Sequence, residues 1–198
     1  MTDTEKKKIV INEILIPSLR LLYGIDYFNI RNRVSERNIC ARFAHHIENR
    51  MREYDKGHNS SLFQCYYADV EYNRMNNGNL KHYEDSERRP RSMVSDLLIH
   101  NRGPRLNYLA VEMKHKDNYQ KRQNDRERLK SIVSMPAESN LDDCVYGTLI
   151  GAFIIYSADE IKVELFEANK EPNEIDFVCY SDNQRFISLN KTYDTWNT

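Results

Sequence analysis

The sequence predicts an α/β fold in which a mixed central β-sheet is flanked by helices. Two segments, 35–53 and 121–134, carry apolar residues at helical spacing. Apolar runs of strand length stand at 93–100, 107–114 and 147–157. In chain order the segments give a helix, a strand, a hairpin, a helix and two more strands, which predicts helices packed against one mixed sheet.

Residues 35–53 form the clearest predicted helix. Ser35 is a favourable N-cap, and Glu36 places a carboxylate in the first turn, where it complements the helix dipole. The helix is expected to end before Gly57.

Residues 121–134 favour a second helix. Leu129, Ile132 and Val133 are expected to face inward. Asp125 and Lys130 are expected to be solvated charges on its outer side, because charged residues on a helix usually face water.

The strands follow from β-preferring residues and turn signals. Between the runs 93–100 and 107–114 stands Asn-Arg-Gly-Pro, which predicts a hairpin with a longer loop. The other expected elements are a strand at 62–73, a long loop at 74–92, a half-buried strand at 161–166 and a short last element at 184–189.

The N-terminal segment is less regular. Residues 5–22 are rich in Ile and Leu, but Pro17 interrupts them, which predicts either a broken helix or a helix followed by a short strand. We expect a single domain over 1–198, with its core at about 35–167 and an N-terminal helical extension at 1–34.

Composition argues against a membrane-spanning or disulfide-rich protein. The most apolar stretch, 146–156, is about strand length, and a membrane span needs roughly 20 residues. The first residues lack the apolar region of a secretory signal. The four cysteines include no Cys-x-x-Cys pair, so they are expected to be reduced and buried and not to bind zinc. A cytoplasmic location is expected.

Charge is distributed unevenly along the chain. Residues 74–130 carry 14 basic and 8 acidic side chains, whereas residues 131–198 carry 4 basic and 12 acidic ones. The basic middle is typical of a surface that faces a phosphate backbone, although the surface of a soluble protein also varies by chance. Arg74, Arg89, Arg91, Lys116 and Lys121 are the candidate nucleic-acid contacts, and a merely polar loop would have the same composition.

Three ionisable residues stand on the two strands of the predicted hairpin. Asp96 lies near the start of the first strand, and Glu112 and Lys114 lie at the end of the second. Antiparallel pairing brings these two ends together, and residues two apart share one face of a strand. We therefore expect Asp96, Glu112 and Lys114 to meet on one side of the sheet.

Such a set has two interpretations. Two neighbouring carboxylates repel each other unless a positive group lies between them, and oxygen ligands of this kind suit Mg²⁺ or Mn²⁺. A metal ion there could activate water for attack on a phosphodiester, with Lys114 orienting or deprotonating that water. The alternative is an ordinary salt bridge at a strand end.

The pattern Ser95-Asp96, hairpin, Glu112-Met113-Lys114 resembles the Asp…Glu-x-Lys signature of the PD-(D/E)XK, or restriction-endonuclease-like, nuclease superfamily. The resemblance covers about residues 35–157 and includes the order of the flanking helices and strands. The segments 69–74, 96–103, 107–114 and 125–130 are similar to those of small bacterial proteins of this superfamily. Ser95 departs from the signature, which usually has Pro there, but Pro supplies no ligand.

The resemblance implies a restriction-endonuclease-like core and a role for each matched residue. Asp96, Glu112 and the Met113 carbonyl would bind Mg²⁺ or Mn²⁺, and Lys114 would act on the attacking water or stabilise the transition state. Glu36 matches a helical acidic residue that can contribute to the metal site, or it simply complements the helix dipole. Retention of the polar residues favours an active enzyme.

The expected function is therefore a metal-dependent nuclease that hydrolyses phosphodiester bonds of nucleic acid, with DNA favoured over RNA. The alternative is a non-catalytic module that keeps the nuclease fold and binds nucleic acid or a protein, because a fold alone does not set a function. The resemblance also implies a possible homodimer, since many such enzymes cut two strands by pairing.

Overall fold

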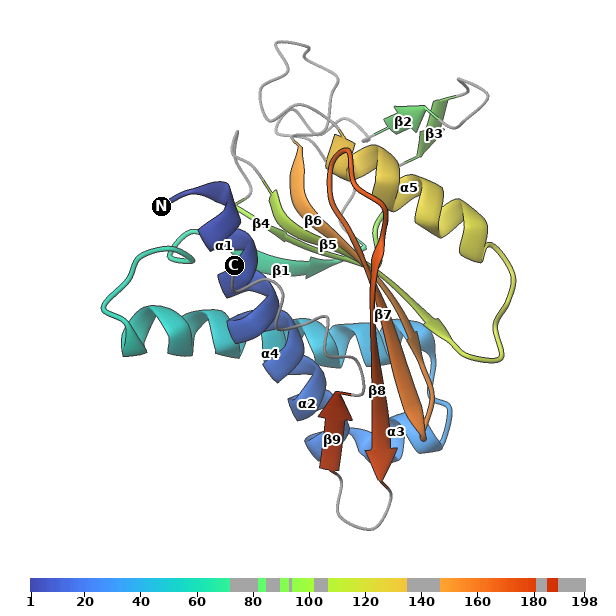
Figure 1. The fold of residues 1–198 in the computed structure, drawn as a ribbon. Helices are drawn as coiled ribbons and strands as arrows, with labels where there is room; N and C mark the ends of the chain where they lie inside the picture. The colour runs from blue at the N-terminus through green and yellow to red at the C-terminus, as the bar shows by residue number, and fades with distance from the viewer. Residues whose placement is uncertain are drawn as a thin grey trace.

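Figure 1 shows the protein as a computed structural model. The structure describes residues 1–71, 82–84, 90–92, 94–101, 107–134, 147–180 and 185–188, and for 82–84, 90–92, 176–180 and 185–188 it describes the backbone alone. None of the helices in these ranges is long and apolar enough to cross a membrane.

Most of the helical residues precede the first strand. The helical elements are α1 (Asp3–Ile9), a π-helical segment (Val10–Leu15), α2 (Ile16–Ile25), α3 (Tyr27–Arg31), α4 (Glu36–Gly57) and α5 (Arg122–Ser134). The strands are β1 (Tyr67–Val70), β2 (His82–Glu84), β3 (Pro90–Ser92), β4 (Leu97–His100), β5 (Asn107–His115), β6 (Thr148–Tyr156), β7 (Glu160–Phe166), β8 (Asn173–Tyr180) and β9 (Arg185–Ser188).

Seven of these strands form one mixed sheet in the order β1-β4-β5-β6-β7-β8-β9. Within it β5 and β6 run parallel, and every other neighbouring pair is antiparallel. A parallel pair needs a crossover, and α5 lies in the connection between β5 and β6. The predicted α/β fold with a mixed sheet flanked by helices is confirmed.

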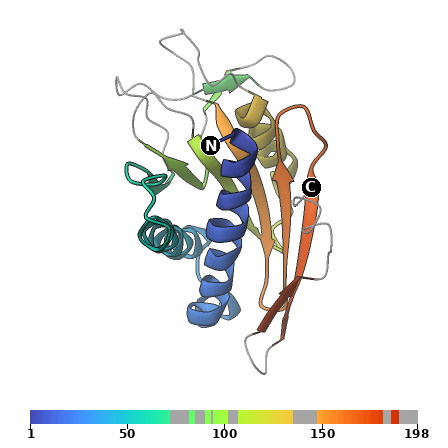
Figure 2. The same cartoon turned by 60° about the vertical axis from the view of Figure 1, so that its left-hand side comes forward.

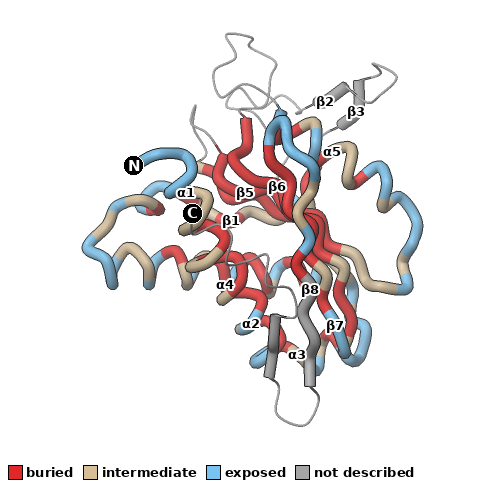
Figure 3. Tube along the Cα trace, in the orientation of Figure 1, coloured by how far each residue is buried: buried red, intermediate tan, exposed pale blue. Residues whose placement is uncertain are grey.

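The two faces of the sheet are covered by different helices. Figures 1 and 2 show α1, α2 and α4 on one face and α5 on the other. β5 alternates accordingly: Leu109, Val111 and Met113 join the larger core under α1, α2 and α4, whereas Ala110 packs in a smaller core with Leu129 of α5. The central strands are buried along most of their length, as Figure 3 shows. Glu112 and Lys114 share the face of Ala110, and so they lie under α5.

Residues 3–25 are continuously helical, so the expectation of a helix followed by a strand is wrong for residues 5–22. α1 and α2 are joined by the π-helical segment, in which the Ile16 N–H reaches the Ile11 carbonyl five residues back. Pro17 lies in the first turn of α2, where its missing N–H is tolerated. The helix therefore continues from the wider π-helical segment into α2 without a break at Pro17.

Several sequence expectations about the elements need correction. The segment 74–92, expected to be a loop, contains β2 and β3, which pair as an antiparallel hairpin. The strand was expected at 62–73, of which 72–73 lie outside the described residues; β1 begins at Tyr67, and before it the Phe63 N–H bonds the Asp55 carboxylate instead of a neighbouring strand. α4 includes Gly57, and β8 was not predicted. Ser35 does cap α4, with its hydroxyl accepting from the Asn38 N–H. Cys40 is buried as expected, whereas Cys65 is exposed.

A buried ion pair joins the N-terminal helices to α4. The Asp26 carboxylate accepts hydrogen bonds from Arg42 Nε at 2.8 Å and pairs with His46 Nε2 at 2.6 Å. Burial by itself would raise the pKa of Asp26, but the hydrogen bonds from Arg42 and His46 outweigh it and hold that pKa below its usual value. The pair therefore stabilises the folded chain while Asp26 is ionised.

We predict that Asp26→Asn lowers the free energy of unfolding by about 1.5–3 kcal/mol at pH 7, the range for a hydrogen bond to a charged group. Because the pKa of Asp26 is lower in the folded than in the unfolded chain, the ionised carboxylate stabilises the fold above the unfolded pKa near ~4, and this stabilisation is lost as the pH falls through the folded pKa. Urea unfolding should therefore show a difference in the free energy of unfolding between the unaltered protein and Asp26→Asn that becomes smaller only at acidic pH. The exposed Asp3, which pairs with Lys6, supplies the control Asp3→Asn, with little effect. An equal loss in both variants would contradict the assignment.

Candidate active site

Asp96 is held in place through both its backbone and its side chain. Its carbonyl accepts from the Glu71 N–H at 3.1 Å and from Cys40 Sγ at 3.1 Å. Its carboxylate Oδ2 accepts from the Met113 N–H at 2.7 Å. Asp96 directly precedes β4, which pairs antiparallel with β5, so the side chain reaches across to the strand that carries Glu112 and Lys114. The expected meeting of the hairpin ends is observed.

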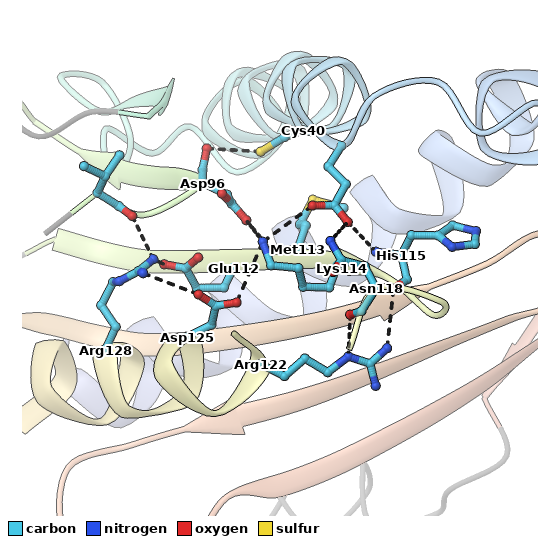
Figure 4. A network of polar contacts seen from close by, with 12 residues as sticks. Cys40, Asp96, Glu112, Met113, Lys114, His115, Asn118, Arg122, Asp125 and Arg128 are labelled. Atoms are coloured by element: carbon cyan, nitrogen blue, oxygen red, sulfur yellow. Dashed lines mark hydrogen bonds and ion pairs between the residues drawn. The ribbon is translucent and has the colours of Figure 1, made fainter. Parts of the chain in front are cut away.

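Glu112 and Lys114 project from β5 toward α5 (Figure 4). Glu112 is 1% exposed, and Lys114 lies on the same face two residues later. Lys114 Nζ is 3.9 Å from Asp96 Oδ2, which confirms that the three predicted residues lie on one side of the sheet.

Helix α5 adds two charged residues to this group. Asp125 is 3% exposed, and its carboxylate lies 3.7 Å from Lys114 Nζ and 3.4 Å from Arg128 Nη2. Arg128 Nη1 donates to Glu112 Oε1 at 2.6 Å and to the Val94 carbonyl at 2.9 Å. The expectation that Asp125 is a solvated surface charge is therefore wrong, because α5 turns it onto β5, where cations compensate its burial.

The spacing of residues along α5 already indicated that Asp125 and Arg128 lie on the face of the helix that packs on the sheet. Asp125 stands four residues before Leu129 and seven before Ile132, which places it on the apolar face of α5. Sequence reasoning assigned it to solvent on residue type alone. Its partners Lys114 and Arg128 become visible only when α5 lies on the sheet.

Glu36, at the start of α4, reaches the same group from the other side. Its Oε1 accepts from the His115 N–H at 3.0 Å and from Asn118 Nδ2 at 3.1 Å, and its Oε2 is 3.5 Å from Lys114 Nζ. Glu36 thus anchors the chain that follows β5 and also pairs with Lys114. We refer to Glu36, Asp96, Glu112 and Asp125 as the acid cluster.

Among the described residues, the acid cluster carries more negative charge than its ion-pair partners balance. Its four carboxylates pair with two cations, Lys114 and Arg128, and these six groups carry a formal charge of −2 when all are ionised. Burial raises the pKa of Glu112 well above its usual value, and the charge of Asp96 adds to this while Arg128 opposes it. Burial likewise raises the pKa values of Asp96 and Asp125 against the opposing effect of Lys114. The cluster favours an additional positive charge.

Lys114 itself is held as an ammonium ion. Burial alone would lower the pKa of Lys114, but Asp96, Asp125, Glu36 and Glu112 outweigh it and raise that pKa above its usual value. A protonated amine cannot accept a proton, so this arrangement does not support the expectation that Lys114 deprotonates water. It suits the other expected role, in which Lys114 stabilises negative charge.

The donors of the predicted metal site fit a hard divalent cation. Glu112 Oε2 is buried and has no hydrogen-bond partner in the described part of the chain, and the Asp96 carboxylate accepts from the Met113 N–H. Within the described ranges, no three His, Cys, Asp or Glu side chains are grouped closely enough to hold a metal ion by themselves. Mg²⁺ requires no such group, since it usually binds one or two carboxylates, several waters and substrate phosphate. Asp96, Glu112 and the Met113 carbonyl supply a set of this kind.

The predicted nucleic-acid contacts fall partly outside the described residues. Arg74 and Arg89 lie outside them, and so does the side chain of Arg91. Lys116 is partly exposed and lies 3.8 Å from both Asp159 and Glu160, so its charge is shared with acidic neighbours. Lys121 is exposed directly before α5 and has a left-handed backbone with φ 63°.

An aromatic residue beside the acid cluster was not predicted. Tyr119 is 72% exposed and follows Asn118, which hydrogen-bonds Glu36. The guanidinium of Arg122 lies 4.4 Å from the centre of the Tyr119 ring and is itself held by the backbone carbonyls of Asn118, His115 and Lys116. Arg122 thus holds an exposed ring one residue along the chain from Asn118, a partner of Glu36.

Comparisons with protein-family models, with curated proteins and with solved structures find no match to this chain. The interpretation of the site therefore depends on its own geometry and chemistry.

Proposed function

We propose that this protein is a metal-dependent nuclease that hydrolyses phosphodiester bonds of DNA. The observation that carries the proposal is the acid cluster, in which, among the described residues, four carboxylates pair with two cations, Lys114 and Arg128. An excess of negative charge at a buried site is costly unless a cation or a proton compensates it.

We also propose that the core is restriction-endonuclease-like. The antiparallel pair β4–β5, the crossover through α5 to the parallel strand β6, and α4 on the opposite face support this. Asp96 directly precedes β4, and Glu112 and Lys114 lie on β5, which agrees with the order of the Asp…Glu-x-Lys pattern.

In this proposal Asp96, Glu112 Oε2 and the Met113 carbonyl hold Mg²⁺ or Mn²⁺. The bound cation supplies Lewis-acid chemistry at the phosphate and makes water a better nucleophile at neutral pH. The Lys114 ammonium, 3.9 Å from Asp96, donates to a phosphate oxygen and stabilises the charge that develops there. Asp125 and Glu36 keep that ammonium charged and oriented between them.

The fixed ring of Tyr119 supports a nucleic-acid substrate, because an unpaired base stacks on an exposed aromatic side chain. We predict that Tyr119→Ala weakens the binding of a single-stranded oligodeoxynucleotide by about 1–3 kcal/mol, or roughly 5–150-fold, whereas Tyr119→Phe keeps it. Fluorescence anisotropy in Ca²⁺ would measure both variants. Equal weakening by Ala and Phe would point to the hydroxyl group and against stacking.

A plasmid-nicking assay tests the proposed function. Supercoiled DNA should be nicked with Mg²⁺ or Mn²⁺ and remain intact with EDTA. Mn²⁺ should also raise the melting temperature of the protein, and Asp96→Asn should remove that increase. DNA binding without nicking, together with no Asp96-dependent stabilisation by Mn²⁺, would reject the enzyme and favour a non-catalytic binding module.

A further inference from the structure

Arg128 connects the two segments that carry the proposed metal ligands. Its Nη1 donates to Glu112 Oε1 on β5 at 2.6 Å and to the Val94 carbonyl at 2.9 Å. Val94 stands two residues before Asp96, so a single guanidinium on α5 bridges the acid-bearing segment before β4 and the acid on β5. Figure 4 shows Arg128 reaching Glu112 from α5.

The bond to Arg128 distinguishes the two oxygens of Glu112. Oε1 accepts from the guanidinium, whereas Oε2 is buried and has no hydrogen-bond partner among the residues that the structure describes. Asp125 contacts both Arg128 Nη2 and Lys114 Nζ, so it fixes the two cations relative to each other. In this arrangement Glu112 Oε1 is bound to Arg128, and Glu112 Oε2 remains available to bind a cation.

We infer that Arg128 is a positioning residue for the metal site: it holds Glu112 through Oε1 and the segment before Asp96 through Val94, so that Glu112 Oε2 and Asp96 face the same divalent cation. This inference rests on the proposed function. It assigns to α5 a part of the site that the Asp…Glu-x-Lys pattern does not contain.

A purely structural salt bridge would show similar distances, and α5 offers a matched example. Arg126 binds both oxygens of Glu164, at 2.6 and 2.7 Å, and its guanidinium lies 4.7 Å from the Phe153 ring. Arg126 is on the same helix and in a comparably buried ion pair, but among the described residues it forms no hydrogen bond or ion pair with a member of the acid cluster. Its variant therefore reports the cost of losing an arginine from α5.

The experiment measures Mn²⁺ affinity by isothermal titration calorimetry, without substrate. Arg128→Ala should weaken Mn²⁺ binding about 10–100-fold, the usual cost of removing a partner of a metal ligand. Arg128→Lys should recover part of this, because one ammonium can reach Glu112 but cannot bridge it to Val94 as a guanidinium does. Arg126→Ala should bind Mn²⁺ like the unaltered protein.

The outcomes separate this inference from the proposed function. If the unaltered protein binds no Mn²⁺, the proposed function fails and Arg128 has no metal site to position. If it binds Mn²⁺ and Arg128→Ala binds equally or more tightly, Arg128 does not position a ligand and the inference alone is overturned. The same conclusion follows if Arg126→Ala loses as much affinity as Arg128→Ala. Should Arg128→Ala fail to fold, Arg128→Lys decides, and unchanged Mn²⁺ affinity in that variant overturns the inference.

Discussion

Glu112→Gln and Lys114→Met are each expected to reduce plasmid nicking by at least about 10²–10³-fold, for different reasons. Glu112 supplies a buried metal ligand, so its amide variant should lose both cleavage and Mn²⁺ binding. Lys114 supplies positive charge among three carboxylates at 3.5, 3.7 and 3.9 Å, so removing it should abolish cleavage while Mn²⁺ still binds.

The comparison of the two variants uses nicking rates together with Mn²⁺ titration. Lys130→Ala is the matched control, because Lys130 is an exposed lysine on α5 and should leave both quantities unchanged. If either Glu112→Gln or Lys114→Met still nicks plasmid in protein free of contaminating nuclease, the proposed roles of these residues in cleavage are wrong. Loss of Mn²⁺ binding in Lys114→Met would mean that the amine organises the site instead of acting on the substrate.

Phe43→Ala is expected to lower the free energy of unfolding by about 3–5 kcal/mol, because it removes a buried aromatic side chain and leaves a cavity. Phe43 is 0% exposed and belongs to the core between α4 and the sheet. α4 also carries Glu36 and Cys40, which contact Lys114 and the Asp96 carbonyl. Loss of this packing should therefore loosen the acid cluster as well.

Phe28→Ala provides the control for this prediction, since Phe28 is 69% exposed on α3. The same change of side chain should there alter the free energy of unfolding by no more than about 0.5 kcal/mol. Urea unfolding followed by circular dichroism measures both variants. Similar losses at the two positions would show that α4 is not packed as the structure has it.

The three residues of the hairpin could be placed together from the sequence because only local rules were needed. A strand alternates its side chains with a period of two, so Glu112 and Lys114 had to share a face. An antiparallel pair brings the start of one strand to the end of the next, which put Asp96 beside them. The N-cap at Ser35 was equally local, since a cap depends on residues within one turn.

The tertiary structure decided which partners compensate the buried charges. Asp125 stands on a helix whose residue types suggest a solvated face, and it is buried because Lys114 and Arg128 compensate it. Arg128 and Glu112 are 16 residues apart in the sequence, and Glu36 and His115 are 79 apart. Neither contact can therefore be recognised from a short sequence pattern. The cost of burying a charge depends on the partners that folding brings to it, and those partners come from distant parts of the chain.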